Sequence, residues 1–84
     1  MITGNSFIPC TVTMYAGHRG EERPSAMIFG GREVAIIALR TARIEEDYRT
    51  RERRRFFEVL GDDGMEYLLC LSEASGVWSV RGPL

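Results

Sequence analysis

The sequence contains no lysine and no glutamine, so all 11 of its basic residues are arginine. Every basic group is therefore a planar guanidinium that stays charged, donates paired hydrogen bonds and stacks on aromatic rings. The formal net charge at pH 7 is only −1. This balance gives no whole-molecule argument for binding nucleic acid or an anionic membrane.

Histidine and cysteine are scarce: there is one histidine, His18, and there are two cysteines, Cys10 and Cys70, without a C-x-x-C spacing. This set lacks the closely spaced ligands of a zinc site, so we expect no metal and no cofactor. Both cysteines lie among apolar residues. That setting favours two buried, reduced thiols over a disulfide, and it leaves open whether the thiols are ever oxidised.

Long apolar runs are absent as well, and none approaches the roughly 18 residues of a membrane-spanning helix. The first ten residues have neither the basic region nor the apolar region of a signal peptide. We therefore expect a cytoplasmic protein that does not contact a membrane.

The composition that is present is that of one small globular domain. The 84 residues are 44% hydrophobic and 27% charged, both ordinary globular values. Gly4, Asn5 and Pro9 oppose regular structure, so we expect residues 1–9 to be a loose tail. Residues 10–82 are expected to form a single domain.

Segments rich in β-forming residues alternate with turn signals along this domain. Six strands are predicted, at residues 10–15, 25–29, 32–44, 56–60, 65–71 and 77–81. Gly30-Gly31 predicts a two-residue hairpin turn with positive φ, and the Gly61–Gly64 sequence GDDG predicts a second tight turn. The third segment breaks its alternation at Ile36 and Ile37, which indicates a bulge or bend.

Six short strands joined by turns predict an antiparallel meander. A flat sheet of this size would leave one face wet and two edges open, so we expect it to curl into an SH3-like, partly open barrel. The predicted fold class is therefore all-β. The predicted core consists of Val12, Met14, Phe29, Val34, Ile36, Leu39, Phe57, Val59, Tyr67, Leu69, Trp78 and Val80.

Several motifs together resemble a family of short bacterial proteins of unknown function. They are the YAGHRGEERP opening, the Gly-Gly-Arg turn, the FFEV strand, the Asp-Gly turn and the late tryptophan. These motifs lie at residues 15–24, 30–32, 56–59, 63–64 and 78, with further matches at Tyr67, Leu69 and Gly76. The resemblance covers residues 10–81 and implies a small all-β protein. It implies no established activity, so it assigns no functional residues.

The charged segment at residues 45–55 differs from that family in its length and arginine content. Residues 49–55 contain five arginines and one acidic residue, Glu52, which gives a local net charge of +4. Two i,i+4 ion pairs would support a short helix, but that helix would bury only Ile44 and Tyr48. An extended hairpin arm or a mobile loop is therefore favoured over a helix.

The arginines of this segment are the main candidate contact residues: Arg49, Arg51, Arg53, Arg54 and Arg55. With aromatic residues nearby, they could contact phosphates and stack on bases. They could instead meet a protein partner or the acidic surface of a second copy. A protein partner or homo-oligomer is favoured over nucleic acid, because the basic window is short and the whole chain is slightly acidic.

The opening loop holds the remaining candidates, His18 and Arg19. Glu21 and Glu22 would repel an anion there, so a structural turn is favoured over a contact loop. No nucleophile motif accompanies His18, and we expect no catalytic residue and no enzyme activity. The sequence thus favours a non-catalytic barrel acting as a protein-binding or self-assembly module. The alternative is a nucleic-acid-binding barrel that uses the arginines at 49–55.

Overall fold

The structure, a computed structural model, describes residues 6–16 and 22–84 of the chain. Its elements are β1 (Ile8–Ala16), β2 (Glu22–Phe29), β3 (Arg32–Asp47), β4 (Glu52–Gly61), β5 (Glu66–Ser72) and β6 (Trp78–Arg81). The all-β prediction is confirmed. Over these described ranges, no helix is long and apolar enough to cross a membrane.

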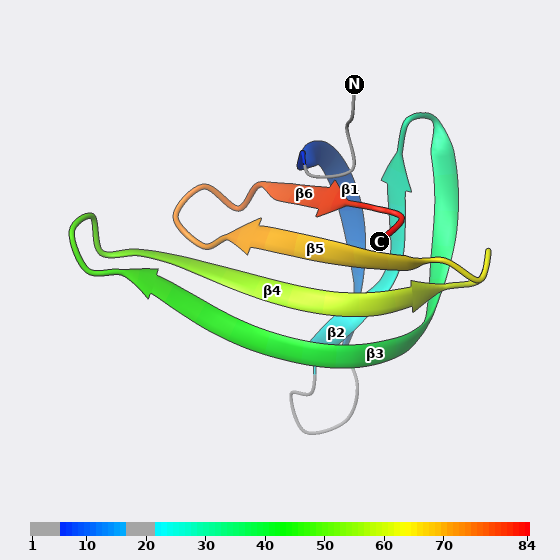
Figure 1. Cartoon of the computed structure of the whole chain (residues 1–84), viewed down its shortest axis with the longest axis horizontal. Coiled ribbons are helices and arrows are strands. Elements are labelled where there is room, and N and C mark those ends of the chain that lie inside the picture. The colour runs from blue at the N-terminus through cyan, green and yellow to red at the C-terminus, as the bar shows by residue number, and fades with distance from the viewer. Residues whose placement is uncertain (1–5, 17–21) are drawn as a thin grey trace.

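Each strand pairs antiparallel with the next one along the chain, and β1 pairs with β6, so the six strands form a closed barrel. The predicted antiparallel meander and small SH3-like barrel are therefore confirmed, and the barrel is closed where a partly open one was expected. In Figure 1, β3 to β6 form one sheet, and β1 and β2 run across its strands. The first part of β1 pairs with β6, from Ile8 opposite Val80 to Cys10 opposite Trp78. Part of the segment expected to be a tail is thus a strand.

Strand β3 pairs with β2 at its start and with β4 over the rest of its length, because it bends. Its first residues, up to Ala35, pair with β2, and from Ile36 onward it pairs with β4. The register with β4 shifts between Ile36 and Ala38 and again between Leu39 and Thr41. Extra residues of this kind bend a strand and increase its twist. The bulge predicted from the broken alternation is therefore confirmed.

Gly61 lies opposite Ile36, on the inside of the bend. A Cβ atom at residue 61 would lie 2.6 Å from Val34 Cγ1 and 2.7 Å from Asp63 Oδ1. No ordinary side chain fits in so little space. Glycine in a strand often marks such a close approach, and here it lets β4 end against the bend of β3.

The buried core is Met27, Val34, Phe57, Val59, Tyr67, Leu69 and Val80, with Cys10, Val12, Phe29, Ile36 and Trp78 partly buried around it. Most of the predicted core is thus confirmed. Met14 is only partly buried and lies outside this cluster. Leu39 is an error, since it is 38% exposed. It lies beyond the first bulge, where β3 has left β2. Met27 was missed, although it lies two residues from Phe29 and therefore faces the same side of β2.

Two apolar side chains are also buried on the outer face of the β4–β6 sheet. Phe56 and Leu68 are buried there although they point away from the barrel core. The ring of Phe7 lies 6.5 Å from the ring of Phe56, and Arg43 Cζ lies 4.7 Å from the centroid of Phe56. Phe7, just before β1, therefore shields part of the Phe56 ring from solvent.

The two cysteines lie on opposite faces of the sheet. Cys10 is opposite Trp78 and Cys70 is opposite Ser79, and neighbouring residues of a strand point to opposite faces. The two thiols are therefore free and not positioned for a disulfide with each other. Both are half-buried. Burial raises the pKa of the Cys10 thiol to about 11, and it is also the main cause that raises the pKa of Cys70.

Both predicted glycine-containing turns are confirmed in their main features. Gly30 and Gly31 have φ values of 58° and 75°, as a two-residue hairpin turn of this kind requires. In the GDDG turn, Asp63 accepts hydrogen bonds from the Tyr67 hydroxyl at 2.5 Å, the Met65 amide at 3.0 Å and Arg32 Nη2 at 3.2 Å. Asp63 thus connects the β4–β5 turn to the start of β3.

These contacts hold the pKa of Asp63 below its ordinary value, with the Tyr67 hydrogen bond as the largest cause. A carboxylate whose pKa is lowered by folding stabilises the fold above its unfolded pKa. That stability is lost as the pH falls through the lowered folded pKa.

Replacement of Gly61 by alanine should destabilise the barrel by about 1–3 kcal/mol, because the new methyl group overpacks the bend. Chemical unfolding of Gly61→Ala, Val34→Ala and the double variant measures this. The double variant should lose less stability than the two single losses together, since Val34→Ala removes the Cγ1 atom that the methyl group would meet. Strict additivity would contradict this account of Gly61.

Replacement of Asp63 by asparagine should flatten the acidic limb of the stability profile. Wild type should lose stability as the pH falls below about 4, the ordinary range for aspartate, while Asp63→Asn should lose less over the same range. Thermal unfolding across pH 2–6 checks this. Asp62→Asn, at an exposed aspartate of the same turn, is the control and should keep the wild-type slope.

Candidate interaction surface

Residues 45–55, here called the arm, are the end of the β3–β4 hairpin, which extends past β5 and β6 (Figure 1). Its strands pair Glu45 with Arg54, Glu46 with Arg53 and Asp47 with Glu52. Of the three conformations left open by the sequence, the hairpin is the correct one. The helix prediction fails because residues 44–47 and 52–55 instead pair with each other as two antiparallel strands.

The turn at the tip of the arm is held by Asp47. Its side chain accepts a hydrogen bond from the Arg49 amide at 2.9 Å, and its carbonyl accepts one from the Arg51 amide at 2.7 Å. Arg51 has a φ of 63°, in the left-handed region that favours glycine. Arg51 therefore adopts a backbone conformation that is sterically unfavourable for a residue with a side chain.

The hairpin brings carboxylates beside the arginines. The whole arm holds five arginines and four carboxylates, so its net charge is +1 where the shorter window at 49–55 suggested +4. Arg54 pairs with Glu52 at 3.2 Å, and Arg53 pairs with Glu73 of the next turn at 3.8 Å. Such exposed pairs each contribute little stability, and they involve two of the five arginines.

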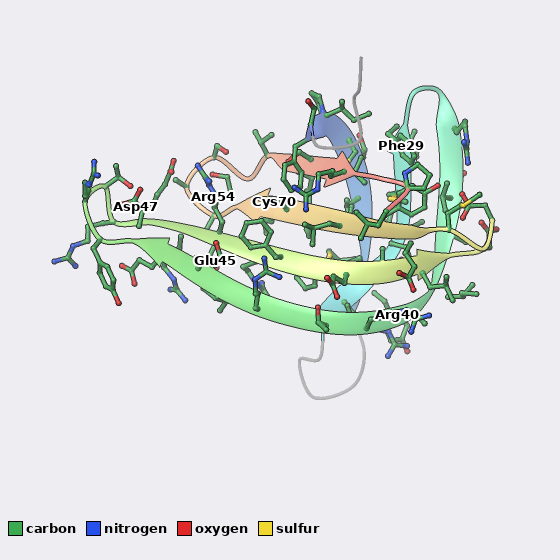
Figure 2. The ribbon with its side chains drawn as sticks, in the orientation of Figure 1. Phe29, Arg40, Glu45, Asp47, Arg54 and Cys70 are labelled. Carbon is green, nitrogen blue, oxygen red and sulfur yellow. The ribbon has the colours of Figure 1, made fainter. Side chains whose placement is uncertain are left out.

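The arginines also lie on different faces of the arm. Along β4, Arg53 and Arg55 share the face of Phe57, and Arg54 points to the other face. Arg55 Cζ lies 5.3 Å from the Phe57 ring centroid, so its guanidinium covers part of the barrel core. Figure 2 shows Glu45 and Asp47 on β3 and Arg54 on the neighbouring β4. The predicted arginine site is thus divided between two faces and the tip.

Large apolar side chains lie exposed along β3 and at the tip. Ile37 is 62% exposed, Ile44 is 53% exposed and Tyr48 is 87% exposed. Beyond Ala35, β3 pairs with β4 on one side, and within residues 6–16 and 22–84 no strand pairs with its other side. Residues 37–47 of β3 are here called the free edge. It forms the lower margin of the sheet in Figure 1.

A groove lies where β2 and β3 separate, at the start of the free edge. It has a volume of about 330 Å³ and is lined by Arg23, Pro24, Ile36, Ile37, Ala38 and Leu39. Arg23 Cζ lies 5.1 Å from the ring centroid of Tyr15, so an exposed aromatic ring flanks the groove. The groove thus adjoins the first, apolar residues of the free edge, from Ile37 to Leu39.

The other predicted contact residues, His18 and Arg19, lie outside the described residues. The ends of that loop are described, and the strands resume at Glu22. In the part of the chain that the structure describes, no three His, Cys, Asp or Glu side chains gather as metal ligands.

Sequence reasoning found the arm but missed the free edge. Nothing in the alternation of β3 showed which of its two edges would lack a partner, because that depends on where β3 leaves β2. The one available signal was the length of the third segment, which exceeds what its neighbour in the sequence could pair. Comparison of the chain with family models, with curated proteins and with solved structures finds no match.

Replacement of Arg51 by glycine should stabilise the arm, because glycine adopts a φ of 63° without steric cost. The expected gain is about 1 kcal/mol in the free energy of unfolding. Arg49→Gly is the matched control at the same tip, and it should lower stability by increasing the freedom of the unfolded chain. Chemical unfolding measures both. Equal effects of the two variants would contradict a role for the Arg51 backbone conformation.

Proposed function

We propose that the protein is a non-catalytic small β-barrel that acts as a protein-binding or self-assembly module in a bacterial cytoplasm. Its contact surface consists of the arm and the free edge. The observation that carries this proposal is that the arm extends beyond the barrel with Tyr48 exposed at its tip and Ile44 exposed at its base. Two of its arginines, Arg53 and Arg54, lie opposite carboxylates. A surface of mixed charge and exposed apolar groups is suited to another protein surface.

The exposed side chains have the chemistry of a protein interface. Tyr48 and Ile44 are large, and the tyrosine combines a wide apolar ring with a hydroxyl group. Aromatic residues and arginine are enriched in protein interfaces, where they contribute most of the binding energy. Clustering of such groups at one end of a small domain supports the proposal.

The charge distribution supports a protein partner over nucleic acid. A nucleic-acid surface gains its affinity from cations that together face the phosphates. Here Arg54 lies opposite Glu45, Arg53 lies opposite Glu46, and the two arginines point to opposite faces. A phosphate backbone approaching either face would therefore meet carboxylates as well as guanidinium groups.

The cytoplasmic location is supported by the two thiols. Cys10 and Cys70 are unpaired and lie on opposite faces of the sheet. Free thiols of this kind are typical of a reducing compartment.

Two variants of equal charge change test the proposal. Arg49→Glu with Arg51→Glu alters the arm tip, and Arg32→Glu with Arg81→Glu alters the barrel outside the arm and the free edge. Oligonucleotide affinity of the wild type should be weak and should not differ between the two variants. If the arm binds nucleic acid, affinity should instead fall steeply with salt and should be lost selectively in the tip variant.

Binding of protein is read out by sedimentation and by chemical cross-linking in cells. We expect cross-links from the arm to protein, either a second copy or another chain, and fewer of them in the tip variant. Salt-sensitive oligonucleotide binding that only the tip variant loses would overturn the proposed function.

A further inference from the structure

The free edge of β3 has backbone hydrogen-bonding groups that no described strand pairs with. In an edge strand, every second residue directs its N–H and C=O groups away from the sheet, where another strand can bind them. In the described ranges, residues 41–47 pair only with β4. This stretch lies past the second bulge, so its alternation is regular. It is exposed throughout.

Two side chains of opposite charge lie symmetrically on either side of Ile44. Arg43 precedes it and Glu45 follows it, and these two side chains share one face of β3, opposite the face of Ile44. Arg43 Nε and Glu45 Oε2 lie 3.1 Å apart, and both side chains are about half exposed. An antiparallel copy of the same strand would therefore present a glutamate to each Arg43 and an arginine to each Glu45.

From this symmetry we propose that two copies of the chain pair antiparallel through their β3 free edges, with Ile44 opposite Ile44 of the second copy. This inference rests on the proposed function and specifies its partner as a second copy. The interface is isologous, so each interaction occurs twice about a twofold axis. Edge-to-edge addition of strands is a common mode of recognition, in which the backbone gives affinity and the side chains give register.

The register centred on Ile44 is the one that the charges support. It places Arg43 opposite Glu45 twice, and it brings two exposed isoleucine side chains together on the other face. A register centred on Arg43 would oppose two arginines, and one centred on Glu45 would oppose two glutamates. Cross-strand pairs of opposite charge stabilise a sheet, and like charges directly opposite each other destabilise it.

Pairing in this register also explains why Ile44 is apolar in a segment that is otherwise charged. Ile44 is more than half exposed in the single chain. Opposite its own copy it would bury apolar surface at the twofold axis. The two sheets would then join as β4–β3–β3–β4 across the axis.

A charge swap tests this proposal with the full chain. Arg43→Glu and Glu45→Arg each place like charges opposite each other twice, so each should weaken self-association about tenfold. The double variant restores opposite charges and should recover association. Sedimentation over a range of protein concentrations measures the change. Thermal unfolding at low concentration verifies that each variant folds, since Arg43 also stacks on Phe56.

Cysteine cross-linking tests the register independently. In a Cys10→Ser, Cys70→Ser background, Ile44→Cys should form a disulfide-linked dimer under mild oxidation, because directly opposed residues lie about 4.5–5.5 Å apart at Cα. Glu46→Cys is the matched control. In this register residue 46 lies opposite residue 42, so two copies of residue 46 would be about 13 Å apart and should not cross-link.

The outcomes separate this inference from the proposed function. Rescue by the double variant together with cross-linking at residue 44 alone supports edge pairing. A monomer at every concentration, or association that ignores the charge swap and cross-links at residue 46 as readily as at 44, overturns edge pairing. Neither of those two results overturns the proposed module, which fails only if the arm binds nucleic acid selectively.

Discussion

The bend of β3 between Ile36 and Thr41 is the constraint on which the rest of the structure depends. Two register shifts turn the strand from β2 to β4, so one strand joins both halves of the barrel. Gly61 makes the bend possible, because any Cβ there would meet Val34. The same bend closes the barrel and leaves the second edge of β3 without a described partner. Barrel closure and the free edge of β3 therefore have one physical cause.

Arginine without lysine gives the small barrel a second means of covering apolar surface. Guanidinium groups lie over five aromatic rings, in the pairs Arg23–Tyr15, Arg32–Phe29, Arg43–Phe56, Arg55–Phe57 and Arg81–Phe7. A guanidinium plane stacks on an aromatic face and remains hydrated at its edge. Among the arginines predicted as contact residues, Arg55 thus contributes to the packing of the domain instead. This use of arginine suits a chain too short to bury all its rings.

In the arm, folding changes the charge that surrounds a run of arginines. In the sequence, residues 49–55 are strongly basic. In the hairpin, the acidic end of β3 pairs with the β4 part of this segment. What remains exposed is a mixed surface with Ile44 near its base and Tyr48 at its tip. In the proposed role, such a surface would discriminate between partners by the pattern of charge, because only a matching order of signs avoids like charges in contact.

The sequence by itself determined the six strands, the two glycine-containing turns, the bulge in the third strand and most of the core. These features depend on alternation, turn residues and β propensity, which are local. Only the tertiary structure decided that Leu39 is exposed, that Phe56 is buried on the outer face, and that the arginines at 53 and 54 lie opposite glutamates. Each of these depends on which strands pair and in which register, and a shift of one residue reverses every face. The free edge of β3 is likewise a property of the pairing and not of the residues that form it.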